Sequence, residues 1–330
     1  MKKLKRSLSL VFFLVGVILL IMLIRNVGFD NVLATFSNLG WKILYVLVFP
    51  IVWYSIQSAA WWRIITDDGH SMSYWHVLLA KLTGEAINTI TPVNFVGGDP
   101  YRIYLLQKKL SKTNSTASVV IDRTMSTLAV ILLLFTALVA AWFYLPLPGQ
   151  WRIFFPIFTA GFFVFFLALV LFQKKGMFTT ISRLLHRLGI QRQRIEAWSE
   201  KIEQTDHQVR GFYQKHKLHF FEIMLLHYIG RLLGAVEIYI IVSLLGLPVE
   251  IVHCLFLSSL TVLINMMFVF IPGSMGVMES GYGGLFYLLK LNPAYGVGIQ
   301  LVRRVRTIFW ISIGLIIMLA YQPKTTEAPG

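Results

Sequence analysis

Residues 84–102 read GEAINTITPVNFVGGDPYR, and this stretch decides how the chain is expected to fold. It closes an apolar run, and Pro92 ends the helix expected there because proline lacks a backbone N–H and clashes with the preceding turn. Gly97 and Gly98 then permit a tight reversal, since glycine adopts backbone conformations that other residues avoid. The stretch therefore predicts two helical segments separated by a break.

Asp99 and Pro100 are residue types favoured at a helix start, as the N-cap and the first helical residue. We expect a short helix to follow, ending at about Leu110. The N-terminus of such a helix carries free N–H groups and the positive end of the helix dipole. A helix broken at membrane depth is tolerated only where it is buried in protein or lines a wet cavity. The break therefore favours an anion or headgroup site; the alternative is an interfacial loop with a capped helix.

The composition of the whole chain indicates an integral membrane protein. Of its 330 residues, 56% are apolar and 14% are charged, whereas a soluble domain carries about 25% charged residues. The mean hydropathy is +0.68. The net charge of +15 then indicates positive cytoplasmic loops and anionic headgroups, and we expect no nucleic-acid partner. A single cysteine, Cys254, excludes a cysteine-rich zinc site, and we expect neither a metal nor a cofactor.

The apolar runs predict an all-α, polytopic helical bundle. They lack the period-2 alternation that a membrane β-barrel requires. The first run follows four basic residues and has no cleavage site, which indicates an uncleaved membrane helix with a cytoplasmic N-terminus. The runs lie at 8–24, 42–62, 74–95, 115–145, 151–172, 219–246, 251–271 and 295–320.

The chain is expected to form a single membrane domain over residues 1–330. Segment 174–217 holds ten Lys or Arg against four Asp or Glu, which places it in the cytoplasm. It is either a solvated connector or an amphipathic helix that binds anionic headgroups. The expected parts are an N-terminal helix (1–41), a first repeat (42–145), a connecting helix with the basic segment (146–218) and a second repeat (219–322).

The two halves of the chain align when the second is laid over the first so that Pro272 meets Pro92. Both halves then read Pro-x6-acid-x23-Arg, and their apolar runs coincide. The other aligned pairs are Asp99 with Glu279 and Arg123 with Arg303. The second half also repeats the break, because residues 271–281 read IPGSMGVMESG, in which Pro272 stops a helix and Gly276 turns the chain.

If each break is the tip of a re-entrant hairpin, the two halves cross the membrane in opposite orientations. The first hairpin then opens to the cytoplasm and the second outward, which is the inverted-repeat plan of many transporters. The basic residues at 108–112 become cytoplasmic, whereas the arginines at 303–306 come near the outer leaflet, against the positive-inside rule. In the alternative, both hairpins span fully and residues 108–112 move outside.

Arginines inside the apolar runs are candidate headgroup ligands. An unpaired charge at membrane depth costs roughly 2.5 kcal/mol or more, so such residues are usually paired or functional, and arginine suits bidentate phosphate binding. We expect Arg123 and Arg303 either to pair with the acidic residue of each break or to hold a lipid phosphate between the halves. The alternative is snorkelling of these side chains to the interface.

Other charges also fall inside the runs. Lys81 and Glu85 stand at i and i+4, so they are expected to pair on one helix face. Arg231 and Glu237 interrupt the run 219–246.

These motifs resemble the membrane domain of lysylphosphatidylglycerol synthases and the related stand-alone, flippase-like UPF0104 proteins. The pattern covers about residues 8–320. The chain departs from it with Asp at 99 and 122, where Glu is commoner, and with Met275 where a second glycine is commoner. The motifs supply the candidate substrate-binding residues, which are Asn88, Pro92, Gly97, Gly98, Asp99, Arg102, Asp122, Arg123, Pro272, Gly276, Glu279 and Arg303.

The resemblance implies a lipid flippase or transporter in a prokaryotic plasma membrane, handling an anionic or phosphate-containing headgroup in a cavity between the repeats. In the two-part synthases a soluble domain attaches the amino acid; we expect that domain to be absent and the chain not to be an enzyme, since no nucleophile–base pair is found. Membrane lipids are the expected partners, together with envelope-lipid biosynthesis enzymes, and no oligomeric state is indicated. The alternatives are a membrane-embedded enzyme and an accessory or assembly factor for lipid or cell-envelope biosynthesis.

Overall fold

A computed structural model describes residues 39–67, 69–91, 97–107, 109–145, 149–187, 192–215, 217–268 and 276–320, and this part of the chain is helical with no strand. The all-α prediction is confirmed for it. The run 8–24, Pro92 and Pro272 lie outside the described residues. The elements are η1 (Gly40–Lys42), α3 (Ile43–Val48), α4 (Pro50–Asp67), α5 (Tyr74–Ile90), α6 (Gly98–Leu106), α7 (Lys112–Tyr144), α8 (Gly149–Arg187), α9 (Arg192–Lys215), α10 (Lys217–Leu244), α11 (Ile251–Met267), α12 (Val277–Leu288) and α13 (Pro293–Ala320).

Several helices are long and apolar enough to cross a membrane. By length and composition the candidate spans in the described residues are Gly40–Asp67, Lys112–Tyr144, Gly149–Gln173 and Leu218–Leu244. α8 is the most exposed of them, with large apolar side chains such as Ile157 and Phe165 more than 60% exposed. Such side chains are stable only against lipid or another protein surface. The chain is therefore a multi-pass membrane protein.

The same series of helices occurs twice along the chain. In both series a helix of 17 residues, α5 or α11, is followed by a shorter helix, α6 or α12, and then by a long helix, α7 or α13. The two series also pack reciprocally, because α5 lies against α13 while α7 lies against α11, and α4 packs on α10. Both series therefore contribute helices to the shared core.

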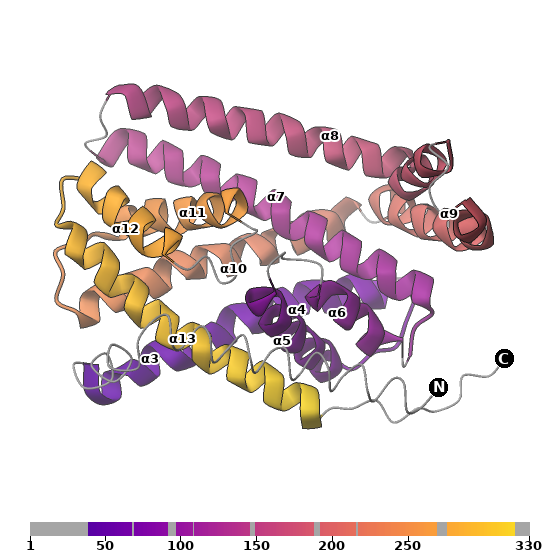
Figure 1. The fold of residues 1–330 in the computed structure, drawn as a ribbon, viewed down its shortest axis with the longest axis horizontal. Coiled ribbons are helices and arrows are strands. Elements are labelled where there is room, and N and C mark those ends of the chain that lie inside the picture. The colour runs from indigo at the N-terminus through magenta and orange to yellow at the C-terminus, as the bar shows by residue number, and fades with distance from the viewer. Residues whose placement is uncertain are drawn as a thin grey trace.

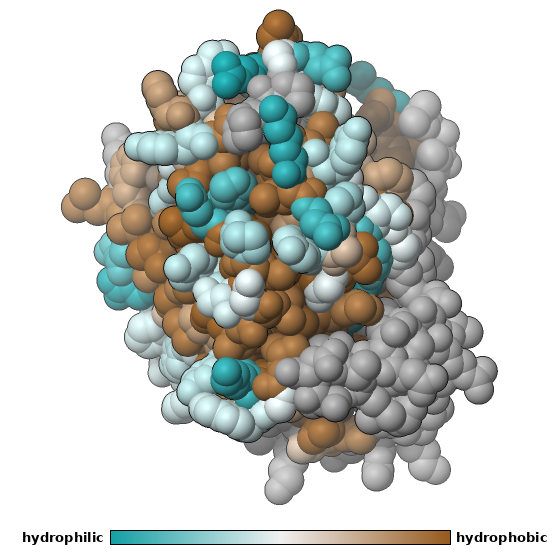
Figure 2. Space-filling view, turned by 90° about the vertical axis from the view of Figure 1, so that its left-hand side faces the viewer, coloured by the Kyte–Doolittle hydropathy of each residue, from teal (hydrophilic) through white to brown (hydrophobic). Residues whose placement is uncertain are grey.

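The two short helices lie toward opposite ends of the bundle. In Figure 1, α12 is at the left and α6 is right of centre, along the axis that α7 follows. The link from α6 to α7 and the helix α9 lie at the right-hand end, and the links from α10 to α11 and from α12 to α13 lie at the left-hand end. Figure 2 views the left-hand end and shows hydrophilic residues scattered over a largely hydrophobic surface.

The basic connector is a packed part of the bundle and not merely a solvated link. Val209, Phe212 and Tyr213 of α9 are buried in a cluster with residues of α4 to α8. α8 bends at Gly176 (φ 97°), and the Asp206 carboxylate of α9 accepts the backbone N–H of the next turn, from Thr179, at 2.7 Å. This capping contact joins the end of the membrane helix to α9.

The start of α6 differs from the prediction. The N-cap is Gly97 and the helix begins at Gly98, so Asp99 lies inside the first turn. Its side chain does not cap the helix, because its oxygens accept from the guanidinium groups of Arg102 and Arg123. The helix ends at Leu106, short of the predicted end at Leu110. The ion pairs, and not the cap, therefore fix the position of this carboxylate.

Candidate functional site

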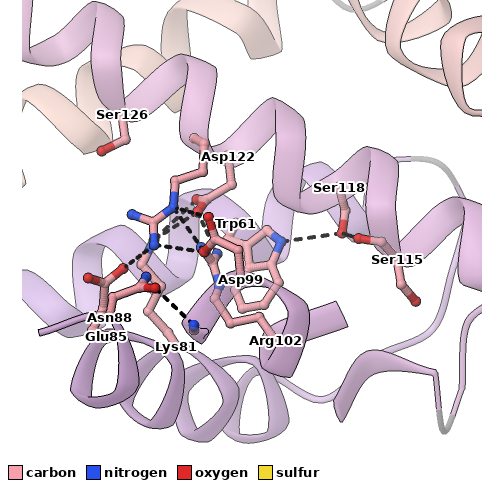
Figure 3. A network of polar contacts seen from close by, with 12 residues as sticks. Trp61, Lys81, Glu85, Asn88, Asp99, Arg102, Ser115, Ser118, Asp122 and Ser126 are labelled. Carbon is pink, nitrogen blue, oxygen red and sulfur yellow. Dashed lines mark hydrogen bonds and ion pairs between the residues drawn. The ribbon is translucent and has the colours of Figure 1, made fainter. Parts of the chain in front are cut away.

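Six charged residues of the first series, four of them buried and two half-buried, form an alternating network of ion pairs, shown in part in Figure 3. The order is Lys81, Asp122, Arg102, Asp99, Arg123 and Glu85. Three cations meet three carboxylates, so the cluster is neutral. The residues come from α5, α6 and α7, and the ion pairs therefore tie the short helix α6 to both neighbours.

Asp122 is the centre of the deep end of this network. It is fully buried and lies 2.9 Å from Lys81 Nζ and 2.5 Å from Arg102 Nη2. His227 of α10 adds a third contact, with its Nε2 3.2 Å from the same carboxylate. The Arg102 guanidinium also lies 3.9 Å from the ring centroid of Trp61, an attractive cation–π arrangement. Buried charges of this kind are stable only when they are paired throughout.

The other end of this network of ion pairs, formed by Arg123 and Glu85, reaches a cavity. Arg123 donates to both oxygens of Asp99, at 2.7 and 2.8 Å, and its Nη2 lies 3.1 Å from Glu85. The expected pairing of Arg123 with the acidic residue of the first break is therefore present. The expected Lys81–Glu85 pair is wrong, because Lys81 pairs with Asp122 and Glu85 pairs with Arg123, both on α7.

The backbones of α5 and α6, the two helices of the first hairpin, approach each other closely. The Gly98 N–H donates to Asn88 Oδ1 at 2.9 Å, which satisfies a free donor at the start of α6. A Cβ on Gly98 would lie 2.1 Å from the Gly84 carbonyl oxygen. A Cβ on Gly84 would meet the Arg102 stem at 2.4 Å. The glycines therefore let α6 lie directly on α5.

In the second series the acidic residue of the break, Glu279, pairs with Arg304 and not with Arg303, the arginine predicted from the sequence. Glu279 accepts from Arg304 Nε at 2.8 Å and from Arg304 Nη2 at 3.3 Å. Arg303 instead donates to the Tyr282 hydroxyl at 2.6 Å and lies 3.6 Å from Glu237 of α10. The expected pair of Arg303 with Glu279 is therefore wrong, because adjacent residues on a helix point about 100° apart.

A cavity of about 540 Å³ lies between the two series. Its wall includes residues of α4, α5, α7, α10, α11, α12 and α13, so both halves build it. Polar groups such as Asn265 and Gln300 line it beside apolar ones. Its cationic lining residues are Arg123, Arg231, Arg303, Arg304 and Arg306, and Glu85 is the acidic lining residue among those described.

The arginines of this cavity lie deep within their helices. Arg123 lies about three turns into α7, which begins at Lys112, and Arg303 lies about three turns into α13, which begins at Pro293. With a pitch of about 5.4 Å per turn these positions lie about 15 Å from the starts of their helices. Arg303, Arg304 and Arg306 therefore lie well inside α13, where they line the polar cavity.

The structure distributes the described sequence-predicted candidates over four places. Asn88, Arg123 and Arg303 line the cavity. The carboxylates and Arg102 of the breaks form the ion pairs behind it, and Gly97 and Gly98 pack the first hairpin, whereas Gly276, at φ 76°, is the N-cap of α12. A backbone of this kind favours glycine.

Several cavity residues were missing from the predicted set. Arg231 was recognisable, since it interrupts an apolar run, but nothing in the sequence connected it to the breaks; Glu237 interrupts the same run and pairs with Arg306 behind the cavity wall. Arg304 and Arg306 belong to the same arginine cluster as the predicted residue, and the sequence did not tell which of them face the cavity. The described residues hold no group of three or more His, Cys, Asp or Glu placed to bind a metal.

The apolar helices and the arginine-lined cavity between them define the class of protein: a multi-pass membrane protein with an internal polar site. The chain belongs to the lysylphosphatidylglycerol synthase TM region family, whose pattern it matches over residues 7–314. It is also similar to the UPF0104 membrane protein MJ1595 of Methanocaldococcus jannaschii, with 28% identity over 146 residues, an alignment that spans 43% of each chain.

Proposed function

We propose that the protein moves a membrane lipid across the bilayer and that its cavity binds the phosphate-bearing headgroup during passage. The observation that carries this proposal is the cavity itself, with five arginines contributed by both helical series. Guanidinium groups suit phosphate because they donate two parallel hydrogen bonds. The family name, which refers to the membrane region of a lipid-modifying synthase, supports a substrate among membrane lipids.

The proposed transport path follows from an inverted arrangement of the two series. α5 and α11 have 17 residues each, a length of about 25 Å, so each falls short of an apolar core about 30 Å thick. With α6 and α12 they form two hairpins that open toward opposite ends of the bundle. The headgroup site is the cavity between the two series, and alternate opening exposes it to each leaflet in turn. Transport, and not lipid modification, is the proposed activity.

The basic end of the bundle gives the proposed orientation. The end of α8 beyond Gln173 carries Lys174, Lys175, Arg183 and Arg187, which is the larger part of the cationic excess of segment 174–217. It lies beside α9, at the same end of the bundle as the link from α6 to α7. The positive-inside rule places this end in the cytoplasm of the plasma membrane, together with the N-terminus.

Translocation of a fluorescent lipid tests the proposed function. The protein is reconstituted into phosphatidylglycerol vesicles with a trace of NBD-labelled phosphatidylglycerol or phosphatidic acid, and an impermeant reductant quenches the outer leaflet. We expect translocation well above that of protein-free vesicles. Arg303→Ala should slow it about tenfold or more, since a hydrogen bond to a charged group contributes about 1.5–3 kcal/mol.

Arg63→Ala is the matched control for this assay. Arg63 forms an ion pair with Glu222 at 3.1 Å, and both side chains are about 40% exposed. This pair lies outside the cavity, so its loss should leave translocation within about twofold, as surface pairs contribute little. Equal rates in wild-type and protein-free vesicles, or an undiminished rate for a folded Arg303→Ala protein, would refute the proposal.

A further inference from the structure

The two sides of the cavity differ in charge balance. The alternating network of the first series is neutral, with three cations and three carboxylates. The second series has four arginines, at 231, 303, 304 and 306, but the described carboxylates that form ion pairs with them are those of Glu237 and Glu279. The described residues therefore leave a surplus of 4 − 2 = +2 on this side.

The surplus can be assigned to particular side chains. Arg303 and Arg306 share the single carboxylate of Glu237, at 3.6 and 3.0 Å. Arg231 has no carboxylate partner among the described residues; its Nη2 donates to the Ser126 hydroxyl at 2.7 Å. Two positive charges are therefore matched by no described carboxylate, although each at membrane depth would be expensive alone.

Unused donors lie on the same wall. Gln300 is 4% exposed, and its Nε2 has no hydrogen-bond partner in the described part of the chain. The Nε groups of Arg231 and Arg306 are likewise buried without a described hydrogen-bond partner. All three residues line the cavity. A buried donor without an acceptor is costly, so the wall is arranged for a ligand rich in acceptor oxygens.

We infer that the cavity binds a phosphate group with two negative charges, a phosphomonoester or a diphosphate, in preference to a singly charged phosphodiester. Such a group cancels the +2 surplus and supplies terminal oxygens to the unused donors. A phosphodiester cancels half of the surplus and has fewer free oxygens. The lipid origin of this group rests on the proposed function, whereas the preference for a dianion rests on the charge count alone.

Binding to two lipids of different headgroup charge tests the inference. The purified full chain in detergent is titrated at pH 8 with dioleoyl phosphatidic acid and with dioleoyl phosphatidylglycerol, and ligand-induced stabilisation is measured by thermal unfolding. We expect phosphatidic acid to bind about tenfold or more tightly than phosphatidylglycerol, the effect of one further charge-assisted contact. Equal affinity for the two lipids would overturn the inference.

Variants of Arg231 locate the preference. Arg231→Gln should reduce the ratio of the two affinities about tenfold, and Arg231→Lys, which keeps the charge, should retain most of the ratio. Arg306→Gln provides a second variant at the shared carboxylate if the first unfolds. A ratio unchanged in both folded Gln variants would contradict the assignment.

Inorganic phosphate, mainly a dianion at pH 8, separates the two sources of the group. Failure of inorganic phosphate to displace bound phosphatidic acid supports a lipid ligand. Displacement by inorganic phosphate at equal concentration supports the dianion site but contradicts its lipid origin, and the translocation assay should then fail as well. Translocation that proceeds with no preference between the two lipids would refute the dianion site while leaving the proposed function intact.

Discussion

Asp122→Asn is expected to lower the free energy of unfolding by about 3–5 kcal/mol, the usual cost of removing one partner from a buried ion pair. Asp122 is fully buried and neutralises both Lys81 and Arg102. The amide keeps the shape of the side chain but leaves three cations facing two carboxylates in the alternating network. The measurement is reversible unfolding in mixed micelles.

Glu222→Gln serves as the control for this substitution. Glu222 also pairs with an arginine, but its side chain is 42% exposed, so its loss should cost less than about 1 kcal/mol. Adding Lys81→Met to Asp122→Asn should recover part of the loss, because the unpaired cation is removed. Similar losses for Asp122→Asn and Glu222→Gln would show that the alternating network does not stabilise the fold as described.

Gly98→Ala is expected to disrupt the first hairpin. The added methyl group would lie 2.1 Å from the Gly84 carbonyl oxygen and 2.4 Å from Asn88 Cγ. Because one of these atoms belongs to the backbone, α6 must move away from α5, and overpacking of this kind costs about 1–3 kcal/mol or more. The shift also displaces Asp99, so we expect weaker phosphate-lipid binding together with a lower unfolding temperature.

Gly211→Ala is a matched helical control. A Cβ at Gly211 of α9 meets nothing within 4 Å, so alanine should be neutral or stabilise by up to about 1 kcal/mol through helix propensity. If Gly98→Ala and Gly211→Ala unfold at the same temperature, the close approach of α5 and α6 is not a constraint on the fold.

Much of the helical architecture could be predicted because hydropathy acts locally. The apolar runs gave α4, α5, α7, α10, α11 and α13, and the break after Ile90 followed from proline and glycine. The ends were less accurate: α6 stops at Leu106 because helix length depends on packing. The bend at Gly176 was not predicted, since Asp206, which caps the turn after it, lies on the following helix, α9.

The composition of the site was predictable only in part. Arg123 and Asp99 were expected to pair and do so. The pair was predictable because proline and glycine mark the break that carries Asp99, and an apolar run marks the helix that carries Arg123. The choice of Arg304 over Arg303 for Glu279 depends on the rotation of α13 against α12, which tertiary packing sets. The cavity itself depends on the packing of one series against the other, and the charge surplus becomes visible only when Arg231 of α10 is placed beside Ser126 of α7.

The central claim is that two oppositely oriented series surround one headgroup cavity. Cysteine labelling from outside the cell tests this claim most directly. The natural Cys254 is fully buried, so a single exposed cysteine can be introduced at Lys109, in the link from α6 to α7, or at Lys290, in the link from α12 to α13. With an impermeant maleimide, Lys290→Cys should react in intact cells, whereas Lys109→Cys should react only after permeabilisation. Reaction of Lys109→Cys in intact cells would mean that the first hairpin spans the membrane fully, and it would contradict the account.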